Sequence, residues 1–493
     1  MRLFLLALLC IQAAWGVAFP VAVQGQSTSP PVNQVSISRY GFTDEDVGYL
    51  LFRLSDGRAV EAHRSDEPRI PASTTKVVTT VAALQILGAD HRFNTTLLHT
   101  GEIRDGALSG DLYLRGGGDP TLSTDDLRDL VSALRQAGVK RITGNFFYDD
   151  SLLPTTREIE PKQPVAVSYN PGLSALSVNY NRIFLRWRRK PKSPTFTTSI
   201  FSPADGGPIP MKAITTGILP RGFDKRIAFL PDGAGAATDR WLLSPALPPR
   251  GTIDLPVRNN PGRVTALLFR TLCQQRDITL PLPQRGNVPA HARLLHAHSS
   301  APLAEIITKV LRYSNNLAAE LVGQATTSQL TNHPSSIPES ASALTQWYRH
   351  TFSHIDWEGF HAMNHSGLSS ATRHTPRQLA EILRHAWRTP LGGARFPDLL
   401  PPPRWGKDDE RIRELVKAKS GTMSYADGLV GYLTTTQGQQ FGFVILITDF
   451  DKRAALDATF DIRIMASSSA AQAWTSRAKT FEKALIARWI MQY

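Results

Sequence analysis

The chain has 493 residues, of which 42% are apolar and 20% are charged, and its formal net charge is +13. This ordinary composition excludes a chain that is disordered throughout, and the length predicts two or three domains rather than a single core. A charge of this sign and size favours anionic surroundings, such as nucleic acid, a cell wall or a membrane surface.

Residues 1–25 have the pattern of a secretory signal peptide. An arginine precedes an apolar run that small residues follow, and the run is short for a membrane anchor, which is the alternative interpretation. Cleavage near Gly16 or near Gly25 fits this pattern. Removal of the segment leaves one cysteine, Cys273, so neither an intramolecular disulfide nor a cysteine-based metal site is expected. Export predicts a periplasmic protein and argues against nucleic acid, so a loose association with the wall or the membrane surface is the favoured explanation of the charge.

Residues 47–64 predict a β-hairpin, because two alternating runs flank a turn at Asp56 and Gly57. An apolar helical segment follows this hairpin and begins near Pro71, a residue that suits the start of a helix. The expected hairpin therefore leads directly into the segment that carries the first candidate site residues.

Ser73 and Lys76 lie three residues apart at the start of this helix, so their side chains share one face. We expect Ser73 in the first turn. A lysine held in a dry site loses part of its preference for the charged form, and it can then take the proton of the serine and create a nucleophile. The same spacing recurs at Ser476 and Lys479 in a charged C-terminal segment, so the motif alone does not decide.

Residues 110–150 predict a strand, a glycine-rich turn, a helix that starts near Ser123, and a second strand. The glycine run at 116–118 lacks the Gly-Lys-Ser/Thr ending of a phosphate loop, so we interpret it as a turn. Residues 161–295 are rich in proline, glycine and short β-like runs, which indicates irregular β structure.

The C-terminal part of the chain predicts helices and an antiparallel sheet. Helical periodicity marks residues 301–324 and 375–387, and three strands are expected within 413–450. A last helix, within 471–493, either lies on a membrane surface through its basic residues or packs its apolar face on the sheet. The second interpretation is favoured.

Two further polar segments follow Ser73 and Lys76 in chain order. Ser314-Asn315-Asn316 interrupts a predicted helix, and Lys419-Ser420-Gly421-Thr422 lies on a predicted strand, where Gly421 lets a ligand approach the backbone. Acyl transfer from a serine needs a polar pair that relays a proton and holds the substrate amide. It also needs a cationic strand that binds a carboxylate. A second Ser-x-Asn at 177–179 shows that the triplet alone proves nothing, so the ordered set of three motifs carries the argument.

The ordered set resembles the penicillin-binding proteins and serine β-lactamases. The long stretch between Ser73 and Ser314 resembles the class C low-molecular-mass penicillin-binding proteins, which are D-alanyl-D-alanine carboxypeptidases and D,D-endopeptidases. The segments GGGDPTLS, YNPGLSALSVNYN, HSGLSSATRHTPRQL and KSGTMSYADGLVGYL resemble the same family. The resemblance extends from about residue 36 to the end of the chain.

This resemblance implies an α+β fold. A transpeptidase-like catalytic domain, with an antiparallel sheet flanked by helices, is expected in residues 26–84 and 296–493. Two nested, β-rich inserted domains interrupt it in sequence. The first is expected in residues 85–104 and 161–295, and the second, a small α/β domain, in 105–160.

The resemblance also implies a role for each motif residue. Ser73 is the nucleophile and Lys76 its base, Ser314 relays a proton to the leaving group, Asn316 holds the substrate amide, and Lys419 fixes the electrostatics. The hydroxyl groups of Ser420 and Thr422, beside Gly421, bind the terminal carboxylate, and the backbone amides of Ser73 and Thr422 form the oxyanion hole. No metal and no cofactor are implied.

Some positions depart from the family pattern or allow two interpretations. Ser420 replaces the usual threonine, Asn315 replaces an aspartate, and the segment 364–368 lacks the usual acidic residue. Asp149 matches a position that reads the amine of a diamino acid, although a strand-end turn aspartate is an equal alternative. The basic run 186–193 suits an anionic wall polymer, but a solvated loop is favoured. His365 is interpreted as structural.

Together these features imply an exported serine D,D-peptidase. It would hydrolyse D-Ala-D-Ala ends, or D-Ala–diamino acid crosslinks, of peptidoglycan stem peptides through an acyl-enzyme, and β-lactam antibiotics would inhibit it covalently. One rival is a β-lactamase or esterase on the same fold, which the large insert and the lack of a recognisable deacylating glutamate loop disfavour. The other is a wall-binding protein without catalysis, which the intact motif residues disfavour.

Overall fold

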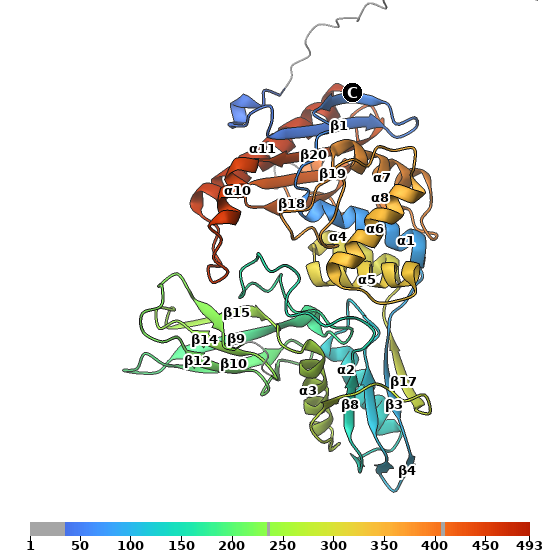
Figure 1. Cartoon of the computed structure of the whole chain (residues 1–493), viewed down its shortest axis with the longest axis vertical. Helices are drawn as coiled ribbons and strands as arrows, with labels where there is room; N and C mark the ends of the chain where they lie inside the picture. The colour runs from blue at the N-terminus through green and yellow to red at the C-terminus, as the bar shows by residue number, and fades with distance from the viewer. Residues whose placement is uncertain (1–34, 234–236, 406–409) are drawn as a thin grey trace, which may run out of the picture.

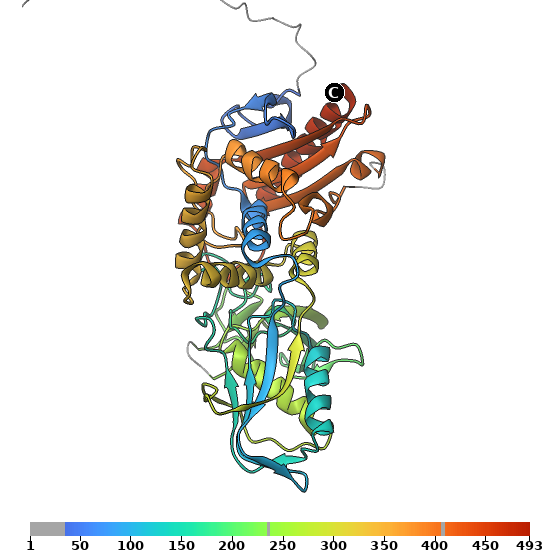
Figure 2. The ribbon, with the colours of Figure 1, turned by 90° about the vertical axis from the view of Figure 1, so that its right-hand side faces the viewer.

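The computed structural model describes residues 35–233, 237–405 and 410–493. The predicted signal peptide, residues 1–25, lies outside the described residues. Figures 1 and 2 show two bodies stacked along the long axis of the molecule, one that contains both ends of the described chain and one built from its middle. Among the helices of the described part, none combines the length and the apolar character that a membrane span requires.

The first body is built on a five-stranded antiparallel sheet in the order β18-β19-β20-β1-β2. Its strands are β1 (Val47–Arg53), β2 (Ala59–His63), β18 (Val416–Met423), β19 (Ala426–Thr434) and β20 (Gln440–Thr448). The predicted hairpin of residues 47–64 and the three predicted C-terminal strands are confirmed. The sheet joins the two ends of the chain, since β1 pairs with β20 along its whole length.

Strands β1, β19 and β20 each contribute to two cores, because successive side chains of a strand point to opposite faces. Leu50 and Val444 pack in the core that contains α1 (Thr75–Leu87), whereas Leu51 and Ile445, their neighbours in sequence, pack against α11. Burial on both faces explains why β19 and β20 are almost continuously apolar. Strand β18, which carries Lys419, pairs with β19 and places Lys419 opposite Val430.

Helices cover both faces of the sheet. One face carries α1 together with α4 (Leu303–Tyr313), α5 (Asn316–Thr331), α6 (Ile337–Thr351), α7 (Pro376–Arg388) and α8 (Phe396–Leu399). The other face carries α11 (Ser469–Gln492), whose Trp474, Phe481, Leu485 and Trp489 are buried against the strands. The favoured interpretation of the last helix, packing on the sheet, is confirmed. Two short helices, α9 (Glu410–Glu414) and α10 (Phe450–Ala458), flank the sheet strands in sequence.

The second body begins and ends with two neighbouring strands. Strand β3 (Asn94–His99) enters it and β17 (Arg293–Ser299) leaves it, and the two pair antiparallel, with Asn94 opposite Ser299 (Figure 2). They belong to a five-stranded sheet in the order β16-β8-β6-β3-β17. Its other members are β6 (Leu112–Arg115), β8 (Phe146–Asp149) and β16 (Gln284–Arg285).

Further small sheets and two helices complete the second body. Strands β4 (Glu102–Arg104), β5 (Ala107–Ser109) and β7 (Arg141–Ile142) form one sheet, and β12 (Thr215–Ile218), β14 (Arg240–Leu243) and β13 (Phe229–Pro231) form another. A four-stranded sheet has the order β11-β10-β9-β15, from β9 (Arg182–Arg189), β10 (Phe196–Ser202), β11 (Ile209–Pro210) and β15 (Arg250–Pro256). Helices α2 (Thr124–Gln136) and α3 (Pro261–Gln274) share one core with these strands.

Strand pairing bears on how this middle region divides. Strand β3 is hydrogen-bonded to β6 and β17 rather than to the strands within 182–256. The expected boundaries, with 85–104 grouped with 161–295 and with 105–160 nested between them, stay a prediction.

The glycine run at 116–118 is packed against other backbone segments. A Cβ atom on Gly117 would lie 2.0 Å from the Asn94 carbonyl oxygen, and one on Gly116 would lie 2.4 Å from the Ala175 carbonyl oxygen. Glycine is therefore required for close packing of the chain, and the space that a phosphate would need is filled by protein backbone.

Candidate active site

Ser73 lies in a single 3₁₀ turn, Ala72–Thr74, immediately before α1. The expected position in the first turn of the α-helix is thus displaced by one short turn. The reason is local: the Thr74 amide donates to the Pro71 carbonyl three residues back, and Ala72 adopts a positive φ of 46°. The turn holds Ser73 at the mouth of a cleft, while Lys76 begins the buried face of α1.

The Lys76 side chain is fully buried and contacts the nucleophile candidate directly. Its Nζ lies 3.0 Å from Ser73 Oγ, 2.8 Å from Asn316 Oδ1 and 2.7 Å from the Ser366 carbonyl oxygen. Burial is the main cause that holds the pKa of Lys76 well below its ordinary value, and the positive charge of Lys419 lowers it further.

These three contacts define the hydrogen-bonding state in which Lys76 can act as a base. The Asn316 Oδ1 and the Ser366 carbonyl oxygen only accept hydrogen bonds, so a neutral amine gives both of its hydrogens to them. The remaining lone pair then faces the Ser73 hydroxyl. This arrangement can remove the proton of Ser73 without any movement of the lysine.

Ser314, Asn315 and Asn316 form the break between α4 and α5. Ser314 ends α4 in the left-handed conformation with φ of 56°, and the Asn315 side chain caps α5 by accepting from the Ala318 amide at 2.9 Å. The predicted interruption of a helix is confirmed. Its effect is to point Ser314 and Asn316 into the same cleft from two different helices.

Both ends of the Asn316 amide are engaged. Its Oδ1 accepts from Lys76, and its Nδ2 donates to the Tyr169 carbonyl oxygen at 2.9 Å. These two contacts fix which end of the amide faces the lysine. They also bring the segment around Tyr169, from the middle region of the sequence, to the wall of the cleft.

Lys419 is buried beside Ser314. Its Nζ donates to Ser314 Oγ at 2.9 Å, which leaves the Ser314 hydroxyl hydrogen free for another acceptor. Burial, aided by the positive charge of Arg404, lowers the pKa of Lys419 to about 7. Lys76 therefore contacts Ser73, and Lys419 contacts Ser314.

Gly421 allows β18 to approach the Ser73 turn. A Cβ atom at this position would lie 2.7 Å from the Pro71 carbonyl oxygen and 2.8 Å from the Ser73 amide nitrogen. The next residue, Thr422, lines the cleft, and its Oγ1 donates to Asp427 Oδ1 at 2.6 Å. Ser420 is exposed and is not among the residues that line the cleft.

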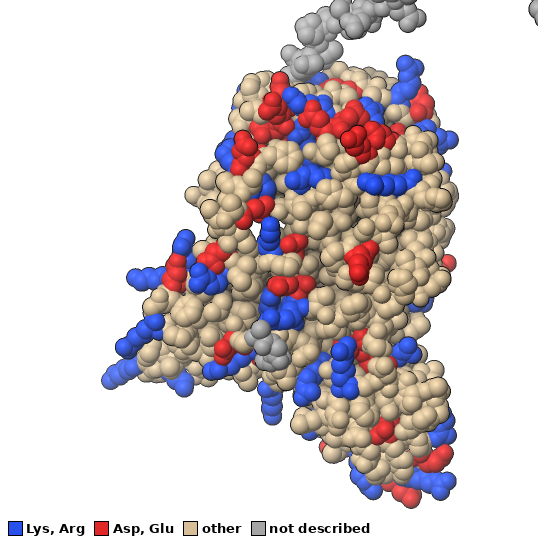
Figure 3. Space-filling view, viewed as in Figure 1, with Lys and Arg blue, Asp and Glu red and all other residues tan. Residues whose placement is uncertain are grey.

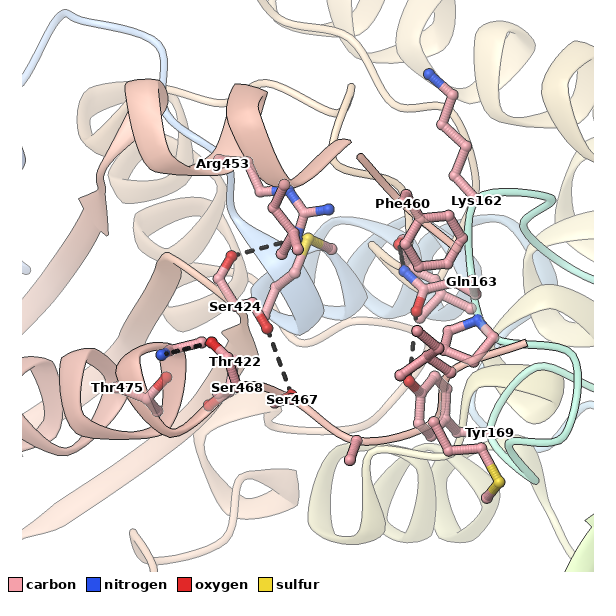
Figure 4. A pocket seen from close by; sticks show the side chains of 18 of the residues that line it. Lys162, Gln163, Tyr169, Thr422, Ser424, Arg453, Phe460, Ser467, Ser468 and Thr475 are labelled. Atoms are coloured by element: carbon pink, nitrogen blue, oxygen red, sulfur yellow. Dashed lines mark hydrogen bonds between the residues drawn. The ribbon is translucent and has the colours of Figure 1, made fainter. Parts of the chain in front are cut away.

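The cleft has a volume of ≈ 620 Å³, which is in the range of ligand pockets. Ser73, Ser314, Asn316 and Thr422 all line it. Figure 4 shows its rim: Gln163 and Tyr169 lie on one side, and Ser424, Arg453, Ser467 and Ser468 lie on the other. The structure thus brings at least one residue of each of the three sequence motifs to the wall of one cavity.

Sequence reasoning missed a support of Lys76, the buried carboxyl group of Glu320. Its two oxygens accept from the His365 amide at 3.0 Å and the Ser366 amide at 2.8 Å, which positions the Ser366 carbonyl for Lys76. Burial raises the pKa of Glu320, although these hydrogen bonds and Lys76 act against the rise. The available signal was one acidic residue on an apolar stretch of α5, four residues after Asn316.

The segment 364–368 is a backbone support in this structure. Asn364 Oδ1 accepts from the Leu368 amide at 3.0 Å, and His365 lies 2.7 Å from the Ser340 hydroxyl. Burial lowers the pKa of His365 to about 3, so its ring is neutral at ordinary pH. These contacts agree with a structural histidine.

Asp149 is not among the residues that line the cleft. Its oxygens accept from the Ser151 amide at 3.0 Å, the Ser151 hydroxyl at 2.6 Å and the Val288 amide at 2.9 Å. Burial acts to raise the pKa of Asp149, but these hydrogen bonds outweigh burial and lower it. The contacts favour the turn interpretation, and the amine-reading role stays a prediction.

Ser476 and Lys479, the second Ser-x-x-Lys pair, are both exposed on α11. Their different environment supplies an internal comparison for Ser73 and Lys76. The same spacing creates a buried contact only where a cleft and a second set of polar residues surround it.

Comparison with known proteins gives the same fold. The crystal structure of penicillin binding protein 4 (dacB) from Haemophilus influenzae matches with a TM-score of 0.71 and 19% identity, over 92% of this chain and 100% of that one. Its complex with a β-lactam matches with a TM-score of 0.67, also at 19% identity and over the same shares of both chains. The predicted α+β fold, a penicillin-binding-protein domain with inserted domains, is confirmed.

Curated sequences point to the same group of proteins. The D-alanyl-D-alanine carboxypeptidase of Actinomadura sp. (strain R39) is 26% identical over 80% of this chain and 76% of its own. The D-alanyl-D-alanine carboxypeptidase DacB of Haemophilus influenzae is 23% identical over 82% and 86%. The sequence model of the D-Ala-D-Ala carboxypeptidase 3 (S13) family matches residues 42–206 and 255–468, which is more than half of the chain. The chain therefore belongs to the D-Ala-D-Ala carboxypeptidase 3 (S13) family.

Proposed function

We propose that this protein is an exported serine D,D-peptidase that hydrolyses D-Ala-D-Ala termini, or D-Ala–diamino acid crosslinks, of peptidoglycan stem peptides. Membership of the S13 family supports the reaction class. The observation that carries the proposal is the buried Lys76, whose Nζ contacts Ser73 Oγ and two groups that only accept hydrogen bonds.

In the proposed acylation step, Ser73 Oγ attacks the carbonyl carbon of the penultimate D-alanine and its proton passes to Lys76 Nζ. The backbone amides of Ser73 and Thr422 stabilise the oxyanion that forms. The C–N bond then breaks, and the leaving amine takes the Ser314 hydroxyl proton. The proton that Lys76 took from Ser73 replaces it on Ser314, so Lys76 is neutral again, while Lys419 stays protonated and fixes the Ser314 hydroxyl. Water then attacks the acyl carbon and gives a proton to Lys76, which returns it to the Ser73 oxygen as that oxygen leaves.

Substrate recognition is proposed to use both ends of the cleft. Lys419 and the Thr422 hydroxyl face the terminal carboxylate, with Ser420 as a secondary contact and Gly421 as the position of close approach. Asn316 aligns the peptide amide. The contact of Asn316 with the Tyr169 carbonyl supports a substrate-selecting role for the inserted region, because it joins that region to the catalytic set.

We further propose export to the periplasm through residues 1–25 and covalent inhibition by β-lactams at Ser73. A β-lactam mimics the acyl-D-Ala-D-Ala geometry and presents a strained amide to the nucleophile. The positive charge of the chain suits a loose association with anionic wall or membrane surfaces.

Incubation with a labelled penicillin, together with release of D-alanine from a diacyl D-Ala-D-Ala peptide, tests this function. A long-lived adduct with D-alanine release is the expected result. Rapid turnover of the penicillin without peptide hydrolysis would instead identify a β-lactamase. Absence of both adduct and hydrolysis would leave a wall-binding protein and would contradict the proposal.

A further inference from the structure

Two buried carboxyl groups lie behind Thr422 and have no part in the acylation chemistry described above. Asp427 of β19 is 1% exposed and stands directly opposite Thr422 in the β18–β19 register. Glu482 of α11 is 4% exposed and lies on the face of the helix that covers the sheet. No cation pairs with either carboxyl group by an ion pair within the described part of the chain.

Asp427 and Glu482 both belong to the interface where β19 packs on α11. Asp427 lies two residues before Leu429, which belongs to the core on the α11 side, so the two side chains share a face of the strand and Asp427 points toward the helix. Within the described residues, Asp427 Oδ2 and Glu482 Oε1 are both buried oxygens without a hydrogen-bond partner. Two buried acceptors that interact with each other are satisfied when a proton lies between them.

Electrostatics agree with this geometry. Burial raises the pKa of Asp427 to about 7, against the hydrogen bond from Thr422 and the charge of Lys479. Burial raises the pKa of Glu482 well above its ordinary value, and the charge of Asp427 raises it further. Lys479 of α11 is exposed, and its charge lowers the pKa of both carboxyl groups. Lys419 points to the opposite face of the sheet. On the neighbouring strand β20, the apolar Ile447 lies opposite Asp427.

The state of this pair decides what the Thr422 hydroxyl can do, because a hydroxyl group has only one hydrogen to donate. When the pair holds one proton, on Glu482, the ionised Asp427 accepts the hydroxyl hydrogen of Thr422. A substrate carboxylate then faces only the lone pairs of Thr422 Oγ1, which cannot donate a hydrogen bond to it. With a second proton on Asp427 Oδ1, that group donates to Thr422 Oγ1, and the Thr422 hydrogen becomes available to a carboxylate.

We propose that Asp427 and Glu482 form a proton-sharing pair that positions the Thr422 hydroxyl, so that protonated Asp427 permits binding of the substrate's terminal carboxylate and ionised Asp427 opposes it. The inference rests on the proposed function only for the identity of the ligand, a peptide that ends in a carboxylate. Asp427 and Glu482 are positioning residues, since both act on the ligand through Thr422.

A binding titration in the Ser73→Ala background tests this switch without turnover. The ligands are an acyl-D-Ala-D-Ala peptide with a free carboxylate and the same peptide as its C-terminal amide, from about pH 6 to about pH 9. The preference for the acid over the amide is expected to fall about tenfold or more as Asp427 ionises, which is the size of a lost charge-assisted hydrogen bond. The ratio of the two affinities cancels pH effects that act on both peptides.

The added substitution Asp427→Asn separates this switch from titration of Lys419. The asparagine amide donates to Thr422 at every pH, so any fall in the preference for the acid that remains in this variant comes from Lys419 and should be smaller than in the parent protein. Thr422→Val, which removes the hydroxyl and keeps the shape, should weaken the preference at low pH and should likewise leave only the Lys419 part of the fall. A transition that persists unchanged in either variant would overturn the proposal. Failure of the wild-type protein to hydrolyse the acid peptide would count against the proposed function instead, because binding and turnover are measured separately.

Discussion

The candidate active site and the β9–β15 sheet of the inserted region both contain positive side chains, in opposite environments. Lys76 and Lys419 are buried beside the cleft, and burial lowers the pKa of each. Arg186, Arg188 and Arg250 are exposed on the outer face of the sheet. Figure 3 shows basic side chains that project from this region into solvent. Burial turns a cation into a base, whereas exposure preserves its charge for attraction at a distance.

The arginine face is unusual for a sheet. Arg188 and Arg250 stand directly opposite each other in the β9–β15 register, an arrangement that costs stability because like charges face one another. Together with Arg186 they line a shallow hollow, and no carboxylate of the described chain forms an ion pair with any of the three. Residues 186–189 lie in β9, so the favoured interpretation of the run 186–193 as a solvated loop is wrong for its first half. The polymer-binding interpretation stays a prediction.

The largest expected effect is the loss of the buried base. Lys76→Met keeps a long apolar side chain in the same space but removes the group that takes the Ser73 proton. We expect the rate of acylation by penicillin to fall by about two to four orders of magnitude, the usual contribution of a general base. Lys140→Met, at an exposed lysine of the inserted region, is the matched control and should acylate normally. Normal acylation in Lys76→Met would contradict the assignment.

Lys419 is expected to have the next largest effect on activity. Lys419→Ala removes a charge-assisted contact with the terminal carboxylate and the hydrogen bond to Ser314. The value of kcat/KM for a D-Ala-D-Ala peptide should fall by about tenfold to a hundredfold, from roughly 1.5–3 kcal/mol of lost interaction. Steady-state kinetics on the purified variant measure this fall, and an unchanged kcat/KM would refute the role.

The depressed pKa of Lys419 also predicts how stability depends on pH. The pKa is about 7 in the folded protein, and a lysine in an unfolded chain titrates near 10.4. Between these values the unfolded state binds more protons, so this group makes the folded state more stable as pH rises. The Lys419→Met variant should therefore gain most relative to wild type below pH ~7, and its advantage should shrink toward pH ~10. Urea unfolding at several pH values measures the difference in free energy of unfolding between Lys419→Met and wild type. A difference that does not change with pH would show that Lys419 is solvated and would contradict this prediction.

A smaller effect is expected at the exposed arginines. The double variant Arg186→Ser, Arg188→Ser should bind an anionic wall polymer several-fold more weakly, and the difference should vanish at high salt because exposed charges are screened. Hydrolysis of a short peptide should not change. The control variant Arg226→Ser, Arg463→Ser removes two arginines that are already paired with Asp224 and Asp461. Equal weakening in both double variants would show that net charge alone matters.

Asp149 should affect stability rather than substrate choice. Asp149→Ala leaves the Val288 and Ser151 amides without their acceptor, a loss of about 1–3 kcal/mol in the free energy of unfolding. Asp129→Ala, at an exposed position of α2, is the control and should change stability by less than about 0.5 kcal/mol. Selective loss of cleavage of stems that carry a free amine would restore the amine-reading role.

The difference between what sequence predicted and what it missed follows from distance along the chain. Ser73 and Lys76, and the residues of each later motif, are neighbours in sequence, so local geometry makes each motif recognisable. Glu320 supports the site through contacts with a distant segment, and nothing in its own surroundings identifies that partner.

The fold shows the same limit. The alternation of residues 47–64 and the apolar runs of β19 and β20 predict strands, because each strand's own pattern records which faces are buried. The pairing of β3 with β17 and the packing of β19, which carries Asp427, on α11, which carries Glu482, arise between remote elements. The 3₁₀ turn at Ser73 escaped prediction because it depends on Ala72 adopting a positive φ, which alanine rarely does.

The most direct test of the central claim is the position of the acyl group. The wild-type protein is incubated with a labelled penicillin, digested and mapped by mass spectrometry, because Ser73 and Ser476 share the same spacing to a lysine but differ in burial of that lysine. We expect a stable adduct on the peptide that contains Ser73, and none in the Ser73→Ala variant. An adduct on Ser476, or one that persists in Ser73→Ala, would contradict this expectation.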